Sequence, residues 1–388
     1  MDVFILDSLY RRIAVIEKYE SLIWTERFSA MGDFELHITY STSTRNLIPI
    51  GTVLHINESY RLMRVETVED YTDDEGRRIL KFTGFSLENV YEQRLAAFQV
   101  EDYWSPYLRD GTPREIIEYV YYSVVIDGNL DVGDIIDGIE LGSDIFPTDT
   151  IDEPVEEFFY IAPNHLSLYA TIKEICDLVG MGFRLVRHPV TGVLYFDLYV
   201  GCDRTTTQST LAAVIFSPDL DNLKNTNRVT SQALYKNVAY VISAGLTHEI
   251  VYATDVDPDI SGFDRRVLIV KADDIEELDP DASDKMIQRG KDELAKNRMF
   301  DALDGELAVN TGYIYGTHYN LGDLVELRDD SGATSQMKVT EVVIINDKEG
   351  RRTYPTLALN LFITPGSWIG WSLVQEWDEL DTEEWEDV

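Results

Sequence analysis

The chain has 388 residues, and its 33 Lys and Arg against 70 Asp and Glu give a formal net charge of −37 at pH 7. This charge argues against sequence-specific nucleic-acid binding and against docking on an anionic membrane, because both depend on Lys and Arg. Hydrophobic residues make up 44% of the chain and aromatic residues 11%, which is enough to bury real cores and argues against disorder. The length predicts two or three domains.

The chain shows no targeting or membrane signal. Its start, MDVFILDSLYRR, is typical of a strand rather than a signal peptide. No apolar run approaches the roughly 18 residues that a membrane span needs, so no membrane insertion is predicted. Cys176 and Cys202 are too far apart in sequence for a metal knuckle, and we expect reduced thiols in a chain made in a cytosol.

The first hundred residues predict a run of short strands, because segments rich in β-branched and aromatic residues alternate with turn residues. A hairpin turn is predicted between Asp70 and Gly76, where the glycine supplies a positive φ. The predicted strands are VFIL, RIAVIEKY, SLIWTERF, DFELHI, TVLHIN, RLMRVETVEDY and RILKFTGF.

The middle of the chain mixes helices with strands. Thr112, Pro113 and Glu115 have the spacing of a capping box at a helix start. A second helix is predicted to begin near Asn164 and to stop at Gly180. Further along, the patterns predict a hairpin from GFRLVR to VLYFDLYV, strands at AAVIFS, RVTSQALY, NVAYVISAG and RRVLIVKA, a helix over 282–298 and a strand-rich block over 301–364.

The last block of the chain repeats the first. Residues 33–38 and 49–56 align with 304–309 and 320–327 at an offset of 271, and 63–78 align with 337–352 at an offset of 274. Eight of the 16 positions from 63 to 78 are identical, although two similar hairpins could share turn residues by coincidence. We interpret the pattern as two copies of one small β-barrel module, marked by the turn glycines Gly51, Gly76, Gly322 and Gly350.

The predicted fold class is therefore mainly β with an α+β insertion, in which two similar small β-barrel modules flank a mixed middle region. The predicted parts are a first module (1–98), an α+β insertion (99–220), strands and a helix leading into the second barrel (221–300), a second module (301–365, repeating about 33–83) and an acidic tail (366–388). Three such chains would present six similar barrels around one axis.

Few residues suggest chemistry. Asp255, Asp257 and Asp259 alternate as calcium ligands do, but Ile260 and Arg266 stand where an EF-hand needs Gly and Glu. An irregular calcium site and a plain acidic turn both remain open. No histidine spacing suits a metal, and the sequence predicts no catalytic residue and no cofactor.

The tail combines acids with tryptophans. Four of the six tryptophans, Trp368, Trp371, Trp377 and Trp385, fall in the last 21 residues among acidic side chains. A segment this polar is not expected to fold alone, whereas buried aromatics anchor interfaces. Docking onto another subunit or a neighbouring protein is predicted, with a frayed acidic terminus as the alternative.

Three segments resemble siphophage tail-tip proteins, also called baseplate hub or tail-associated proteins. They are the start MDVFILDSLYRRIAVIEKYESLIWTERFSAMGDFEL, the segment GFSLENVYEQRL from Gly84 to Leu95, and YNLGDLVEL over 319–327 with the EGRR hairpin. The resemblance covers about 1–365 and leaves out the Trp-rich tail.

The resemblance implies a structural role without enzymatic activity. Such hubs are homotrimers whose paired barrels form a pseudo-hexameric ring around the genome exit channel. The ring links the six-fold tail tube or distal tail protein to three-fold tip or fibre proteins, and the tape-measure protein is a further possible partner. The implied location is the virion tail tip, after assembly in the bacterial host cytoplasm.

Two other functions compete with the hub. A receptor- or carbohydrate-binding tip protein would need an aromatic platform, for which Trp104 with Tyr103 and Tyr107 is the candidate. A cell-wall hydrolase would need paired carboxylates, and the acids at 149–157 are the candidates.

The acidity is concentrated in three stretches. Residues 115–172, 250–284 and 353–388 carry net charges of −13, −8 and −8, while both repeated modules are close to ordinary composition. If these acids face the channel, they would repel DNA and let the genome slide.

Overall fold

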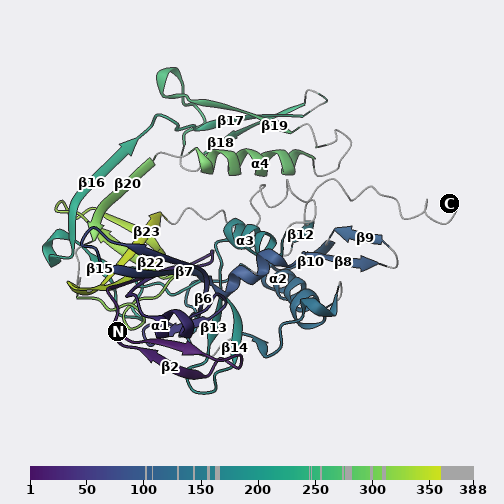
Figure 1. Ribbon diagram of the computed structural model, residues 1–388. Coiled ribbons are helices and arrows are strands. Elements are labelled where there is room, and N and C mark those ends of the chain that lie inside the picture. Colours follow the sequence, from purple (N-terminus) through teal and green to yellow (C-terminus); the bar gives the residue numbers. More distant parts are fainter. Residues whose placement is uncertain are drawn as a thin grey trace.

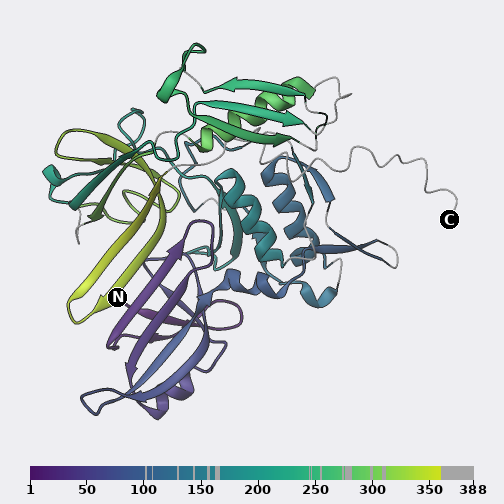
Figure 2. The ribbon, with the colours of Figure 1, turned by 90° about the horizontal axis from the view of Figure 1, so that it is seen from above.

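We describe the protein from a computed structural model that covers residues 1–359 apart from short stretches, namely 101–102, 107, 129–130, 143–144, 155–157, 162–166, 244, 246, 254–255, 273–274, 276–281, 298–299 and 308–311. Strands predominate, and they are grouped in four parts: two strand-rich modules side by side, a mixed middle region, and a small subdomain (Figures 1 and 2). The mainly β class predicted from the sequence is confirmed.

The first module contains all seven strands predicted from its sequence pattern. Along β4, Phe34, Leu36 and Ile38 are buried while the residues between them are partly exposed, which is the alternation of a sheet with one covered face. The elements are β1 (Val3–Leu6), β2 (Arg12–Ile16), β3 (Ser21–Arg27), β4 (Asp33–Thr39), α1 (Thr42–Leu47), β5 (Val53–Ile56), β6 (Met63–Thr72) and β7 (Arg78–Ser86). The short helix α1 was not predicted; its N-cap Ser41 accepts a hydrogen bond from the Thr44 amide at 3.0 Å.

The second module begins earlier than residue 301. Its strands are β15 (Ile215–Phe216), β16 (Leu223–Ser231), β20 (Phe300–Leu307), β21 (Leu324–Arg328), β22 (Thr334–Asp347) and β23 (Gly350–Leu359). β16 pairs with β20, so the 68 residues between them are inserted within the module. β22 also pairs with β3, so strands of both modules belong to one 11-stranded sheet, while β16 and β20 form a separate pair.

The two modules have the same local backbone geometry. Gly51 and Gly322, with φ of 89° and 88°, donate to the carbonyls of Val65 and Val339 at 2.7 and 2.8 Å. A bulge follows each acceptor, between Val65 and Thr67 in one module and between Val339 and Glu341 in the other.

The hairpin turns of the two modules differ in length by one residue, which the sequence alignment does not show. In the first module the Asp73 amide donates to the Arg77 carbonyl and Gly76 has φ of 80°, whereas Asp347 pairs directly with Gly350 in the second. The offset between the two modules is therefore 274 residues along the first strand of the hairpin (β6 and β22) and 273 along the second (β7 and β23), because the second turn is one residue shorter.

The middle region packs two helices against a three-stranded sheet, ordered β11-β14-β13. Its elements are the 3-10 helix η1 (Leu87–Gln93), β8 (Ala97–Val100), β9 (Tyr103–Pro106), β10 (Leu108–Gly111), α2 (Pro113–Tyr121), the π-helix η2 (Tyr122–Ile126), η3 (Val132–Asp134), β11 (Ile139–Leu141), β12 (Phe158–Ile161), α3 (Leu168–Val179), β13 (Gly182–Arg187) and β14 (Leu194–Tyr199). Tyr121 stacks on Phe196 with ring centroids 3.9 Å apart.

The capping predictions for these helices have mixed outcomes. The capping box of Thr112 and Glu115 is confirmed, and Gly180 ends α3 with φ of 75°. α3 begins at Leu168 rather than near Asn164, because the Ser167 side chain accepts from the Ala170 amide at 3.1 Å. Asn164 itself lies outside the described residues.

The inserted subdomain is a three-stranded sheet with one helix on one face (Figure 1). It comprises β17 (Val238–Ser243), β18 (His248–Tyr252), β19 (Val267–Ala272) and α4 (Ala282–Lys296), which matches the predicted third helix at its start. Val241, Val251, Val270, Met286 and Leu294 form its separate core. Among the described residues, no helix is long and apolar enough to cross a membrane.

Candidate functional site

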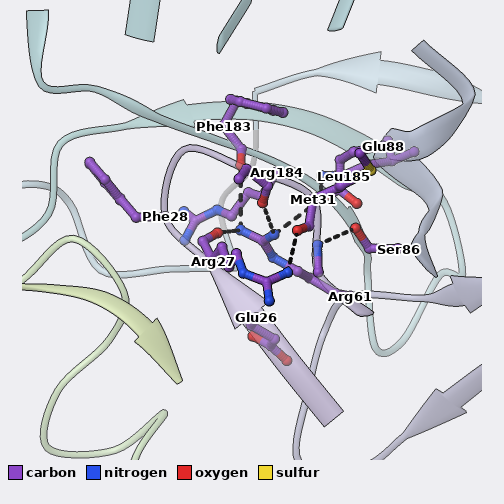
Figure 3. A network of polar contacts seen from close by, with 12 residues as sticks. Glu26, Arg27, Phe28, Met31, Arg61, Ser86, Glu88, Phe183, Arg184 and Leu185 are labelled. Atoms are coloured by element: carbon purple, nitrogen blue, oxygen red, sulfur yellow. Dashed lines mark hydrogen bonds and ion pairs between the residues drawn. The ribbon is translucent and has the colours of Figure 1, made fainter. Parts of the chain in front are cut away.

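The two modules and the middle region meet at Phe28, the residue that follows β3. The Phe28 amide donates to the Thr340 carbonyl of β22 at 2.8 Å. Its carbonyl accepts from the Phe183 amide at 3.2 Å and from the Tyr199 hydroxyl at 3.4 Å, both in the middle region. One buried residue thus connects all three parts, and we call the surrounding cluster the junction (Figure 3).

Arg61 is the buried charge at the centre of the junction. It is 2% exposed, and its guanidinium donates to the Arg27 carbonyl at 2.7 Å and to the Phe183 carbonyl at 3.3 Å. Glu88, fully buried, places Oε1 3.4 Å from Nη1 of Arg61 (Figure 3). Burial opposes the charge on Arg61, but the acidic groups around it, Glu88 first among them, together outweigh burial and raise the pKa of Arg61.

A second acid extends the network toward the second module. Glu26 is 3% exposed and accepts from Trp24 Nε1 at 3.1 Å and from the Tyr315 hydroxyl at 2.8 Å. A small cavity lies beside it, lined by Glu26, Tyr60, Arg61, Phe146, Tyr199 and Tyr315 among others. Burial and the nearby Glu26 carboxylate raise the pKa of Tyr315, so that its hydroxyl stays protonated and can donate.

Two further buried charges join the second module to the middle region. Lys338 on β22 is 2% exposed and donates from Nζ to the Gly180 carbonyl, the C-cap of α3, at 3.0 Å. Burial lowers the pKa of Lys338 to about 7, although the carboxylates of Asp149 and Asp323 act in the opposite direction. Asp323 accepts from Arg204 Nε at 2.6 Å and from the Cys202 amide at 2.8 Å.

The contacts of the junction fix the relative positions of the parts that it joins. Each of its charged groups has a hydrogen-bond or ion-pair partner from another part of the chain. Such contacts are directional, and breaking one leaves an unpaired charge in a dry interior. The junction therefore holds the two modules in one relative orientation.

The predicted calcium loop gains no support as a metal site. The Asp259 amide donates to Asp257 Oδ1 at 2.9 Å, which is a local turn contact, and Asp255 lies outside the described residues. No group of three His, Cys, Asp or Glu able to hold a metal occurs within the described part of the chain. Cys176 and Cys202 are both buried free thiols.

Of the described acids considered for a hydrolase, Asp149 and Glu153 are engaged in contacts with other parts of the chain, and Asp152 is exposed. Asp149 accepts from the Val200 and Gly201 amides at 2.8 and 3.0 Å, and burial raises its pKa. Glu153 pairs with Arg114 at 2.6 Å, and Glu156 and Glu157 lie outside the described residues.

The aromatic candidates fall largely outside what the structure describes. Trp104 and Tyr103 belong to β9, whose backbone pairs with β8, and Tyr107 is outside the described residues. The tail tryptophans Trp368, Trp371, Trp377 and Trp385 lie outside them as well. The signature glycines Gly51 and Gly322 occupy equivalent turns, as described above, while Gly76 and Gly350 occupy turns of different length.

Sequence reasoning missed the residues that make the junction. Arg61, Glu88, Lys338 and Asp323 belong to residue types that are rarely fully buried, and nothing in their local pattern separates them from surface charges. The available signal was that Glu88 lies inside the segment GFSLENVYEQRL and Asp323 inside YNLGDLVEL, two of the segments that carried the family resemblance.

Comparison with solved structures places this fold in the class of phage tail proteins. The tail protein from Neisseria meningitidis MC58 matches with a TM-score of 0.52 and 13% identity, over 94% of this chain and 98% of that one. The 43 kDa tail protein of prophage MuSo2 from Shewanella oneidensis is also similar, with a TM-score of 0.49 and 14% identity over 92% and 96% of the two chains. Prophage tail protein gp18 from Listeria monocytogenes EGD-e is similar with a TM-score of 0.46 and 10% identity, over 92% of this chain and 94% of that one.

The chain belongs to the family of Siphovirus ReqiPepy6 Gp37-like proteins, which it matches over residues 2–357. Its fold is similar to that of a phage-type tail protein. No curated protein matches its sequence.

Proposed function

We propose that the chain is the baseplate hub at the tail tip, where three copies form a pseudo-hexameric ring around the genome exit channel. The ring links the six-fold tail tube or distal tail protein to three-fold tip proteins. The observation that carries the proposal is the matched pair of modules, with the same turn at Gly51 and Gly322 and the same bulge after Val65 and Val339.

Two modules in one chain have a specific use at a symmetry mismatch. Three chains supply six similar surfaces to a six-fold neighbour, and the remaining parts of each chain repeat three times for a three-fold neighbour. A protein that needed only one symmetry would gain nothing from carrying both copies.

The junction supports the same role. A ring of six modules closes only if the angle between neighbouring modules is fixed. Within the chain that angle is held by the β22–β3 pairing and by the buried contacts of Phe28, Arg61 and Lys338. We further propose that the acidic stretches border the channel and repel the passing DNA.

The test is the copy number, in solution and in the particle. Native mass spectrometry of the purified chain should give a trimer, and imaging of the tail tip should show three copies around the channel. A monomer at all concentrations together with six copies per particle would refute the proposal. Side chains resolved in the same image would show whether the acids face the channel; if they face outward, the repulsion proposal fails.

A further inference from the structure

The corresponding strands β6 and β22 differ in which strands pair with one of their edges. Along β22, residues 334–338 pair with β21 and residues 341–346 pair with β3 on the same edge. Along β6, Met63 and Arg64 pair with β5, but the described residues supply no partner for the edge of 67–72.

Exposure follows this difference. Val342 and Ile344, under the β3 contact, are fully buried. Their counterparts at an offset of 274 are Val68, which is half-buried, and Asp70, which is exposed. The uncovered edge of β6 therefore corresponds to the edge of β22 that pairs with β3.

The strand that corresponds to β3 in the second module is β16. In the β3–β4 hairpin, Leu22 pairs with Leu36 and Thr25 pairs with Asp33. In the β16–β20 pair, Leu223 pairs with Leu307 and Asn227 pairs with Asp304, which are the repeat partners of Leu36 and Asp33. Within the described part of the chain, β20 is the sole partner of β16, so its outer edge is open as well.

We propose that β6 of one protomer pairs antiparallel with β16 of a second copy, repeating between chains the β22–β3 contact made within one. The inference rests on the proposed ring and specifies its subunit contact. Transferring the observed register of 341–346 on 22–27 predicts these intermolecular pairs: Thr72 with Leu223, Tyr71 with Lys224, Glu69 with Asn227, Val68 with Arg228 and Thr67 with Val229.

The charges of the two edges are complementary. β6 carries three acids and one base, Arg64, whereas β16 carries Lys224 and Arg228 and no acid. Of the three acids, Glu66 pairs with Arg64 and Asp70 with Arg78, which leaves Glu69. The two basic side chains of β16 suit an acidic partner strand. The contact is head-to-tail, so it either closes into a ring or grows without limit.

Engineered disulfides test the register directly. Two variants carry adjacent pairs, Glu69→Cys with Asn227→Cys and Val68→Cys with Arg228→Cys. Adjacent pairs in an antiparallel ladder alternate in type, so one of them has the closely spaced, non-hydrogen-bonded geometry that suits a disulfide. After mild oxidation, a non-reducing denaturing gel should show covalent species up to three chains and none larger.

Two control variants calibrate the experiment. Thr25→Cys with Val343→Cys reproduces the corresponding contact within a chain, where the two residues are direct partners, and should close without raising the mass. Glu75→Cys with Asn227→Cys moves one thiol to the exposed hairpin tip. The matched pair should give about tenfold more covalent trimer than this control, because pairing raises the effective thiol concentration.

The outcomes separate this contact from the function. A wild-type trimer that neither matched pair cross-links would overturn the strand contact and leave the hub standing. A wild-type monomer without cross-links would overturn both. Covalent ladders that continue beyond three chains would show an open assembly and overturn the closed ring.

Discussion

Gly51 and Gly322, 271 residues apart, have the same backbone conformation and differ in what lies over them. A Cβ on Gly51 would lie 3.5 Å from the Arg64 guanidinium, which is ordinary contact. A Cβ on Gly322 would lie 2.7 Å from the Phe28 ring, inside the junction. Both modules therefore have the same turn, but only the turn of the second module packs tightly against the junction.

Alanine at these two glycines should separate backbone strain from packing. Gly51→Ala should lower the free energy of unfolding by about 1–2 kcal/mol, the cost of a left-handed residue with a Cβ. Gly322→Ala should lower the free energy of unfolding by about 1–3 kcal/mol more than Gly51→Ala does, because its Cβ also overpacks the junction. Urea denaturation of both variants measures the difference, and equal losses would contradict the close contact with Phe28.

Removing the buried guanidinium should destabilise the chain far more than removing an exposed one. Arg61→Met leaves Glu88 buried without its partner and should cost about 3–5 kcal/mol in the free energy of unfolding. Arg64→Met, whose side chain is 46% exposed, is the matched control and should change it by less than about 0.5 kcal/mol.

The same pair can be tested for coupling. Arg61→Met combined with Glu88→Leu should lose less stability than the two single variants added together, because neither charge is then left alone. Losses that simply add would show that the two groups do not interact in the folded chain.

Lys338 should make stability depend on pH. The folded pKa is about 7 against an ordinary value of 10.5, so between these values the unfolded chain binds a proton that the folded chain has released. The free energy of unfolding should therefore rise through this window, by up to about 1.4 kcal/mol per pH unit. Lys338→Met should lack that rise.

The measurement is urea unfolding of wild type and Lys338→Met at several pH values from 7 to 10. Lys348→Met, whose side chain is 72% exposed, should follow the wild-type profile in parallel. Parallel profiles for wild type and Lys338→Met would mean that Lys338 stays protonated when buried.

Removing the tail tests its proposed docking role. A chain ending at Thr364 lacks all four tail tryptophans and should bind a neighbouring subunit or tail protein more weakly. Native mass spectrometry and binding to the purified distal tail ring would show the change. Unaltered assembly and binding would eliminate the docking role.

Local patterns predicted local structure well. The seven strands of the first module, the Thr112 capping box and the Gly180 stop all depend on a few neighbouring residues. The pairing of β22 with β3 joins residues more than 300 positions apart, and no local pattern encodes it. The buried charges Arg61 and Lys338 escaped prediction for the same reason, since their partners come from distant segments.

The ribbon of β16 and β20 carries the chain out to the inserted subdomain and back along paired strands, with Ser231 beside Phe300 at its far end. Both ends of the insertion are thus already held together before the subdomain begins. A different domain, or a short turn, could be spliced onto this stem without disturbing the sheet below. The inserted subdomain could therefore be replaced at this stem while the strands of the two modules stay the same.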